Sequence, residues 1–251
     1  MDDFARIEPN GGRVVSIAID KYVYVTLYRR FDENIRVSYS EIEKVRSVDE
    51  IQHALVREAM RLTGVESGIE ITTIADIPGR GTGLGSSSTV TVGLLNALHN
   101  LQRRSPSKEQ LAEEACRIEI DVLGAPIGRQ DQYAASFGGF NSIRFGSAGV
   151  KVEPMLINEN LIDEISSKFT LVYTGMTRSA SKVLAAKPSS ERNKLLKLKK
   201  IRDQADLAAE MIGSGDLESL GMLLNDAWLT KRETSPAVSN QEIDKLYQSI
   251  M

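Results

Sequence analysis

A glycine-rich segment is the strongest chemical signal in the sequence. Residues 78–88 read Pro-Gly-Arg-Gly-Thr-Gly-Leu-Gly-Ser-Ser-Ser and lie between a strand-like segment and an apolar, helix-like one. Phosphate oxygens need several backbone N–H donors at close range, which glycines permit, and the first turn of a helix adds donors and a favourable dipole. Gly83, Gly85 and the serines at 86–88 suit that task. The alternative is a glycine-rich turn in which Ser86 is a plain helix cap.

The segment differs from the two best-known phosphate loops. It lacks the Gly-Lys-Ser/Thr ending of a P-loop and the glycine spacing of the dinucleotide-binding fingerprint. The sequence therefore predicts a phosphate-binding loop of another type.

Two carboxylates bracket a second loop about thirty residues further along the chain. Glu119 lies late in a predicted helix, and Asp131 follows a Gly-Pro turn. Phosphoryl transfer needs a carboxylate for the divalent cation that neutralises the phosphates, and usually a group that orients or deprotonates the attacking hydroxyl. The two carboxylates can divide these tasks.

Each carboxylate also has a structural alternative. Glu119 can be a solvated helix charge paired with Arg117 or Lys108. Asp131 can be the cap of the helix that follows it, and this role is compatible with a catalytic one. Asp121 competes with Glu119, but it lies two residues away and so points to a different side of the helix.

Both segments resemble motifs of the GHMP kinases, the family of galactokinase, homoserine kinase, mevalonate kinase and phosphomevalonate kinase. Residues 78–88 are similar to the second family motif, Pro-x3-Gly-Leu-Gly-Ser-Ser-Ala, with one additional residue before Gly83 and serine at the last position. Residues 119–132 resemble the Glu-x4-Gly-x-Pro-x-Gly-x-Asp region, in the Gln-Asp-Gln form of the sugar-kinase branch. Residues 10–24 and 173–181 are very like segments of the bacterial D-glycero-D-manno-heptose 7-phosphate kinases.

The resemblance implies an enzyme that transfers phosphate from ATP, with Mg²⁺, to an alcohol group of a sugar. The implied acceptor is the anomeric hydroxyl of D-glycero-D-manno-heptose 7-phosphate, in nucleotide-heptose biosynthesis. A kinase for another monosaccharide, such as fucose or galactose, is one alternative. A non-catalytic remnant that binds nucleotide or sugar phosphate is the other.

The resemblance also implies roles for individual residues. Asp131 is the base or orienting acid, and Ser87 and Glu119 are the Mg²⁺ ligands. The implied ATP-binding residues are Gly81, Thr82, Gly83, Leu84, Gly85, Ser86, Ser87 and Ser88.

The residues that would bind the sugar phosphate have a weaker sequence signal than the phosphate loop and the acidic pair. A sugar phosphate needs fixed cations and hydroxyl partners, and arginine can bind a phosphate with two hydrogen bonds. We expect Lys21 and Arg178 to supply the cations, with further contacts from Thr177 and Gln132. An ordinary helix start with an exposed cation is the alternative for Thr177 and Arg178. The two histidines, at 53 and 99, have no metal-ligand spacing and are interpreted as structural.

The elements that position these residues follow from composition and capping signals. Ser47 with Glu50, and Ser107 with Gln110, form capping boxes that begin helices. Strand-like composition marks residues 13–29, 68–75, 140–145 and 169–174. Helical spacing marks residues 51–64, 107–121, 190–212, 217–230 and 240–250, and the apolar run 90–98 follows the glycine-rich segment as a further helix.

The fold that the resemblance implies is the α+β, two-domain GHMP-kinase fold. Residues 1–158 would form the N-terminal ATP-binding domain, which is ribosomal protein S5 domain 2-like. Residues 159–251 would form an incomplete C-terminal domain, a ferredoxin-like α/β-sandwich. Residues 1–9 hold no counterpart of the first family motif, and the chain stops before the third. The resemblance therefore implies a core truncated at both ends, with weak or no activity by itself.

Composition narrows the classes of partner. The 251 residues carry 31 basic and 34 acidic side chains without a long run of either sign, so a nucleic-acid partner is not indicated. Apolar runs such as residues 90–98 fall short of the roughly 20 residues that span a bilayer. The single cysteine, Cys116, cannot form an internal disulfide. We expect a cytoplasmic protein, with a small-molecule sugar phosphate as substrate, no membrane partner and possible homodimer formation.

Overall fold

The computed structural model describes residues 11–77, 83–175 and 191–250, without the side chains of residues 191–194 and 237. The chain divides into two compact units, Ala18–Gly138 and Met1–Ile17 with Gly139–Met251. The first unit holds every candidate site residue that the structure describes. The domain boundary predicted at residue 158 differs from the boundaries of these two units, and it stays a prediction.

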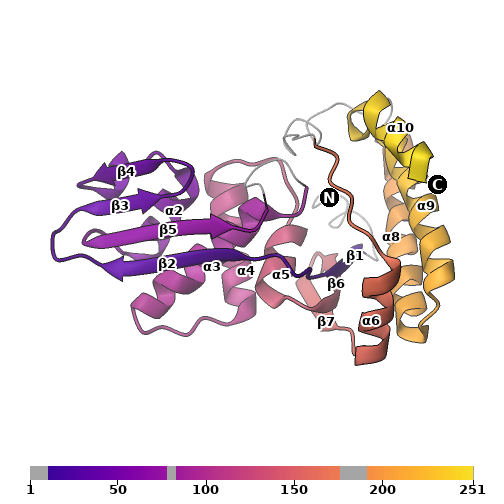
Figure 1. The fold of residues 1–251 in the computed structure, drawn as a ribbon, viewed down its shortest axis with the longest axis horizontal. Coiled ribbons are helices and arrows are strands. Elements are labelled where there is room, and N and C mark those ends of the chain that lie inside the picture. The colour runs from indigo at the N-terminus through magenta and orange to yellow at the C-terminus, as the bar shows by residue number, and fades with distance from the viewer. Residues whose placement is uncertain (1–10, 78–82, 176–190, 251) are drawn as a thin grey trace. The chain divides into compact units, whose positions relative to one another are not determined.

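The first unit is built on a mixed sheet with the strand order β2-β5-β3-β4. The strands β2 and β5 are antiparallel, β3 and β5 are parallel, and β3 and β4 are antiparallel. Figure 1 shows the four strands side by side, with helices behind them. The strands are β2 (Val23–Arg29), β3 (Ile35–Ser38), β4 (Ile42–Val45) and β5 (Ile69–Ala75).

Alternation of side chains places one face of this sheet against helices. Ile35 and Val37 on β3 are fully buried and pair in register with Ile69 and Ile71 on β5. They share a core with the helices α2 (Ala54–Thr63) and α3 (Ser86–Leu101). Gly93 permits close packing of α3 on β2, because a Cβ there would lie 2.9 Å from Val25 Cγ2. This core fixes α3, whose first residues belong to the predicted phosphate loop.

Two further helices, α4 and α5, follow α3 along the chain. Ser107 caps α4 (Lys108–Cys116) by accepting a hydrogen bond from the Gln110 N–H at 3.1 Å, as its capping box predicted. A π-helical stretch, η2 (Arg117–Val122), continues α4 and is followed by α5 (Gln130–Phe137). Such π-helical turns are rare and often occur at functional sites.

The other capping box has a different outcome. Ser47 precedes a short 3-10 helix, η1 (Val48–Glu50), and its hydroxyl donates to Glu50 Oε1 at 3.0 Å. The helix α2 begins only at Ala54, where His53 Nδ1 accepts from the Val56 N–H. The predicted helix start at residue 51 is therefore wrong, whereas the structural role of His53 is confirmed. The helix ends as expected at Gly64, which has φ 74°.

The second unit contains an antiparallel sheet with the order β1-β6-β7. Its strands are β1 (Gly12–Ile17), β6 (Phe140–Gly146) and β7 (Gly149–Pro154). Its described helices are α6 (Glu159–Lys168), α8 (Glu191–Ser214), α9 (Leu217–Arg232), η3 (Pro236–Val238) and α10 (Gln241–Ile250). Residues 13–29 thus form successive strands that belong to different sheets. No helix in the described ranges is both long and apolar enough to cross a bilayer.

One predicted strand is wrong. Residues 169–174 have strand composition, but the structure gives them no strand. Leu171, Val172 and Tyr173 are exposed, and none of the described strands pairs with them. A strand needs the backbone of a neighbour, so local composition alone does not form one.

Candidate active site

The start of α3 has the geometry that phosphate binding requires. Gly85 is the N-cap residue, with φ 70° and ψ 21°, and Gly83 has φ 76°. These left-handed conformations favour glycine. Ser86 is the first helical residue, so the interpretation of Ser86 as a plain cap is wrong. The predicted ATP contacts Gly81 and Thr82 lie outside the described residues.

The carboxylate of Glu119 lies beside the first two turns of α3. Ser88 Oγ donates to Glu119 Oε2 at 2.7 Å, and Thr91 Oγ1 donates to Oε1 at 2.6 Å. Gln132 Nε2 also donates to Oε2. Ser87 Oγ is 3.5 Å from Oε1, at the limit of a hydrogen bond. The structure therefore joins the glycine-rich segment and the acidic segment at one carboxylate.

Glu119 is buried without a cation. Its exposed fraction is 2%, and its hydrogen-bond partners are neutral. No ion pair joins it to a lysine or arginine in the ranges that the structure describes. The interpretation as a solvated charge paired with Arg117 or Lys108 is therefore wrong, and the Lys108 ammonium instead donates to the Phe137 carbonyl. Asp121 is exposed, as its position two residues away predicted.

Thr91 is the residue that sequence reasoning missed. It is fully buried and follows Ser87 by one helical turn, where its hydroxyl contacts both the Ser87 carbonyl and Glu119. A threonine inside the apolar run 90–98 was the available signal, because a polar side chain on a buried helix face needs a partner.

Asp131 lies against the same helix start. A Cβ built on Gly85 would be 3.4 Å from Asp131 Cβ and 3.5 Å from its Cγ. Asp131 is the second residue of α5, whose N-cap is Arg129, so the interpretation of Asp131 as the helix cap is wrong. In the described part of the chain, the carboxylates of Asp131 and Glu119 thus both lie near the predicted phosphate loop.

Gln132, the next residue on α5, is directed inward. Its exposed fraction is 0%, and its partner is Glu119. Tyr133 is also buried and donates from its hydroxyl to Glu113 Oε1. Burial, followed by this hydrogen bond, raises the pKa of Tyr133 above its ordinary value. These contacts fix the first turn of α5 against the helices that hold Glu119.

Lys21 is the one remaining predicted substrate residue that the structure describes. Lys21 is exposed, and no contact within the described ranges joins its ammonium group to Asp131 or Glu119. Thr177 and Arg178 lie outside the described residues. His99 is buried with Nε2 2.7 Å from Glu114 Oε2, which confirms its structural interpretation.

The donor set at the cluster fits a magnesium ion held mainly by a nucleotide. The described residues contain no group of three or more His, Cys, Asp or Glu side chains arranged to hold a metal. They do offer the Ser87 hydroxyl near the Glu119 carboxylate, both hard oxygen ligands. Mg²⁺ is typically bound through one or two carboxylates together with substrate phosphates and water. The residues therefore fit such an ion without forming a complete protein cage.

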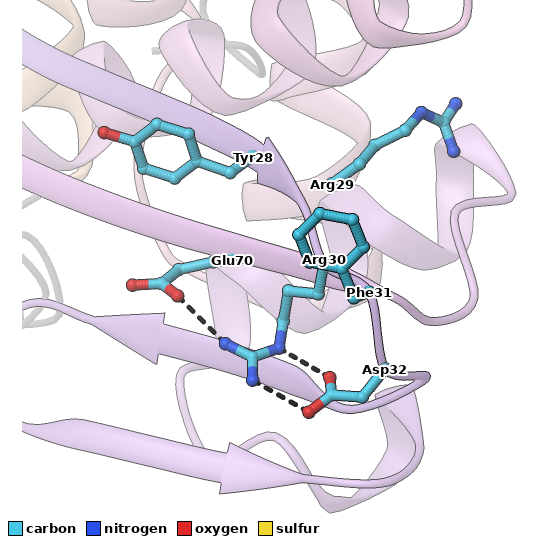
Figure 2. Close-up of a pocket in the computed structure, with 6 residues that line it drawn as sticks. All are labelled: Tyr28, Arg29, Arg30, Phe31, Asp32 and Glu70. Atoms are coloured by element: carbon cyan, nitrogen blue, oxygen red, sulfur yellow. Dashed lines mark hydrogen bonds and ion pairs between the residues drawn. The ribbon is translucent and has the colours of Figure 1, made fainter.

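A pocket of about 460 Å³ lies elsewhere, where β2 ends and β5 begins. Figure 2 shows Arg30 there between Asp32 and Glu70, whose carboxylates accept its hydrogen bonds at 2.7, 2.9 and 3.0 Å. The Arg30 guanidinium is already neutralised by these partners, and the pocket contains none of the predicted site residues. The chemistry of the Glu119 cluster, rather than the size of this pocket, identifies the candidate active site.

Comparisons with known proteins agree with this assignment. Residues 49–139 match the family model of the GHMP kinases N terminal domain, a range that includes residues 83–88, Glu119 and Asp131. The D-glycero-alpha-D-manno-heptose 7-phosphate kinase of Campylobacter jejuni is 29% identical over 94% of this chain and 74% of that protein.

Two solved structures share the fold. One is a D-glycero-D-manno-heptose 1-phosphate kinase from Bacteroides thetaiotaomicron, with a TM-score of 0.76 and 24% identity over 90% of this chain and 72% of that one. The other is the Lactococcus lactis galactokinase complexed with galactose, with a TM-score of 0.69 and 17% identity over 99% of this chain and 75% of that one. The predicted α+β fold is thereby confirmed, and the two compact units are consistent with its two-domain description.

Proposed function

We propose that this chain, a member of the GHMP kinase family, phosphorylates the anomeric hydroxyl of D-glycero-D-manno-heptose 7-phosphate with MgATP. Its relatives are phosphotransferases that act on hydroxyl groups. The heptose is proposed as acceptor because the Campylobacter relative with that substrate in its name matches almost the whole chain. The reaction would supply a sugar phosphate for nucleotide-heptose synthesis, in the cytoplasm.

The observation that carries the proposal is the buried, cation-free carboxylate of Glu119 beneath the start of α3. A buried ionised group is costly unless a counter-charge accompanies it. A divalent cation that arrives with a nucleotide would supply this counter-charge. The first turn of α3 would meanwhile offer its backbone N–H groups to the phosphates.

Asp131 has the position expected of the residue that acts on the acceptor. Its side chain lies next to Gly85, the N-cap residue of α3, where a built Cβ would be 3.4 Å from Asp131 Cβ. A sugar hydroxyl bound next to Asp131 would face phosphates bound at that helix start. Asp131 would accept or orient the hydroxyl proton during transfer.

Ser87 and Glu119 would hold the magnesium ion. The bound ion would neutralise charge on the nucleotide phosphates during transfer. Ser88, Thr91 and Gln132 each donate a hydrogen bond to the carboxylate that faces the ion. On the substrate side, Lys21, Thr177 and Arg178 are proposed to contact the sugar phosphate. Residues 1–158 and 159–251 are proposed as the two functional domains.

A substrate panel tests the proposal. The 251 residues, extended at each end by the neighbouring coding sequence, are incubated with MgATP and one of heptose 7-phosphate, fucose, galactose or mevalonate. ADP release is measured, with Asp131→Asn as the matched control. We expect acceptor-dependent ADP release with heptose 7-phosphate that is lost in the variant. Faster release with another acceptor would overturn the substrate assignment. ATP binding without transfer to any of them would instead favour a non-catalytic, nucleotide-binding function.

A further inference from the structure

Gln132 occupies an unusual position for a residue of a sugar-binding segment. Its side chain is fully buried, and its amide group donates to Glu119 Oε2. A residue that contacts a diffusible sugar normally has exposed polar atoms in the free protein. The burial of Gln132 therefore points to a task inside the protein, although its sequence position next to Asp131 suggested contact with substrate.

Chemistry fixes the orientation of the Gln132 amide. A carboxylate can only accept hydrogen bonds, so the amide nitrogen must face Glu119. The amide oxygen, Oε1, then has no hydrogen-bond partner among the described residues. Such a buried, unpaired acceptor costs free energy. Among the described residues, the hydrogen bond to Glu119 is therefore the one polar contact of this amide group.

The other hydrogen bonds to the Glu119 carboxylate indicate the role of the hydrogen bond from Gln132. Ser88 and Gln132 both donate to Oε2, while Thr91 donates to Oε1. Oε1 is also the oxygen closer to the Ser87 hydroxyl, at 3.5 Å. Each carboxylate oxygen thus has two partners among the described residues, but the Ser87 contact of Oε1 is the longest of the four and therefore the weakest.

We propose that Gln132 is a positioning residue, which holds the Glu119 carboxylate in the orientation that binds the divalent cation and does not itself contact the sugar. This inference rests on the proposed function of the site. Asp131 and Gln132 are consecutive on the first turn of α5, where Asp131 lies next to Gly85 and Gln132 donates a hydrogen bond to Glu119. The same turn would therefore align the acceptor-activating carboxylate with the cation-binding one.

The test uses Gln132→Met, which keeps a similar volume and removes the amide. Gln204→Met is the matched control, because Gln204 is also buried, donates to a carboxylate (Asp226 Oδ2, 2.6 Å) and has an unpaired Oε1, but belongs to the other compact unit. ATP binding is measured by calorimetry across a Mg²⁺ titration, and Mn²⁺ binding in the presence of ATP by electron paramagnetic resonance.

We expect Gln132→Met to raise the Mg²⁺ concentration needed for tight ATP binding by about 10- to 100-fold, the usual effect of losing an outer-shell partner of a metal ligand. Metal-free ATP binding and the KM for the sugar should change little. An unchanged Mg²⁺ requirement in Gln132→Met would overturn the proposal. So would an equal shift in Gln204→Met, or a raised sugar KM with normal Mg²⁺ dependence.

A second pair of variants covers the case in which Gln132→Met does not fold. Thr91→Val removes the hydroxyl donor at nearly constant shape, and Thr91→Ser restores it. We expect the Val variant to show the same Mg²⁺ defect and the Ser variant to regain most of the parental affinity. Equal Mg²⁺ dependence in both would show that the donors around Glu119 do not control the cation. These binding readouts do not require phosphoryl transfer, so their result is separate from any failure of the proposed activity.

Discussion

Asp131 lies next to Gly85, although 46 positions separate the two residues in the sequence. The Asp131 carboxylate is therefore close to the start of α3, where phosphates would bind. A Cβ at Gly85 would reach ordinary contact distance, 3.4 Å from Asp131 Cβ. Any longer side chain there would compete with the carboxylate for space. The proximity of Gly85 and Asp131 relates the predicted phosphate loop to the residue that we propose to act on the acceptor.

Substitutions of Gly83 and Gly85 distinguish the effect of backbone strain from the effect of crowding the Asp131 side chain. Both have a left-handed backbone, which asparagine tolerates, but only Gly85 has Asp131 within 4 Å. We expect Gly85→Asn to lower kcat at least about tenfold more than Gly83→Asn, because small displacements of a catalytic group are costly in rate. Steady-state kinetics and thermal unfolding measure the two effects. Equal losses of kcat would show that the Asp131 contact is unimportant for transfer.

The cation site is tested by Glu119→Gln and Ser87→Ala. Each removes a hard oxygen ligand or its charge, so Mg²⁺-dependent nucleotide binding should weaken. We expect the larger effect, about tenfold or more, from Glu119→Gln, because it removes a buried charge as well as a ligand. Calorimetric titration with MgATP and with metal-free ATP measures the difference. A Mg²⁺ dependence equal to that of the parent would remove Glu119 from the site.

The Arg30–Asp32 contact outside the active site predicts a pH effect on stability. Hydrogen bonds from Arg30 and then from Asn34 hold the pKa of Asp32 well below its ordinary value of 3.8. The ionised form is thus favoured in the folded state. Its stabilising contribution is complete above the ordinary pKa and is lost as the pH falls below it through the lowered native pKa.

We therefore expect Asp32→Asn to lower the thermal midpoint at pH 6, with a smaller difference from the parent at pH 3. Added salt should also reduce the difference at pH 6, because the pair is exposed. Thermal unfolding of both proteins at each pH measures this. A difference that is the same at pH 6 and pH 3 would contradict the assigned cause.

The local parts of the site were predictable from the sequence. Glycines followed by serines before an apolar run specify a loop and a helix start through backbone freedom and capping, which are properties of neighbouring residues. The predicted helix start at Ser107 and the helix end at Gly64 were confirmed for the same reason. The α+β fold followed from the family resemblance of those local motifs.

The tertiary parts were not predictable in this way. The burial of Glu119 depends on Ser88, Thr91 and Gln132, which reach it from two helices distant in the sequence. The short strands β3 and β4 and the helix α6 were missed because their composition carries little signal over so few residues. The predicted strand at 169–174 was wrong because strand formation depends on a pairing partner.

The most direct test of the account is the effect of Asp131→Asn on phosphoryl transfer and on nucleotide binding, measured in one preparation. Single-turnover transfer from γ-labelled ATP to heptose 7-phosphate gives the chemical rate, and calorimetry gives the affinity for MgATP. We expect a rate at least about a hundredfold below the parent, because the lost group is the one proposed to act on the acceptor hydroxyl. MgATP affinity should change little, since Ser87 and Glu119 are intact. Near-parental transfer by Asp131→Asn would contradict the account.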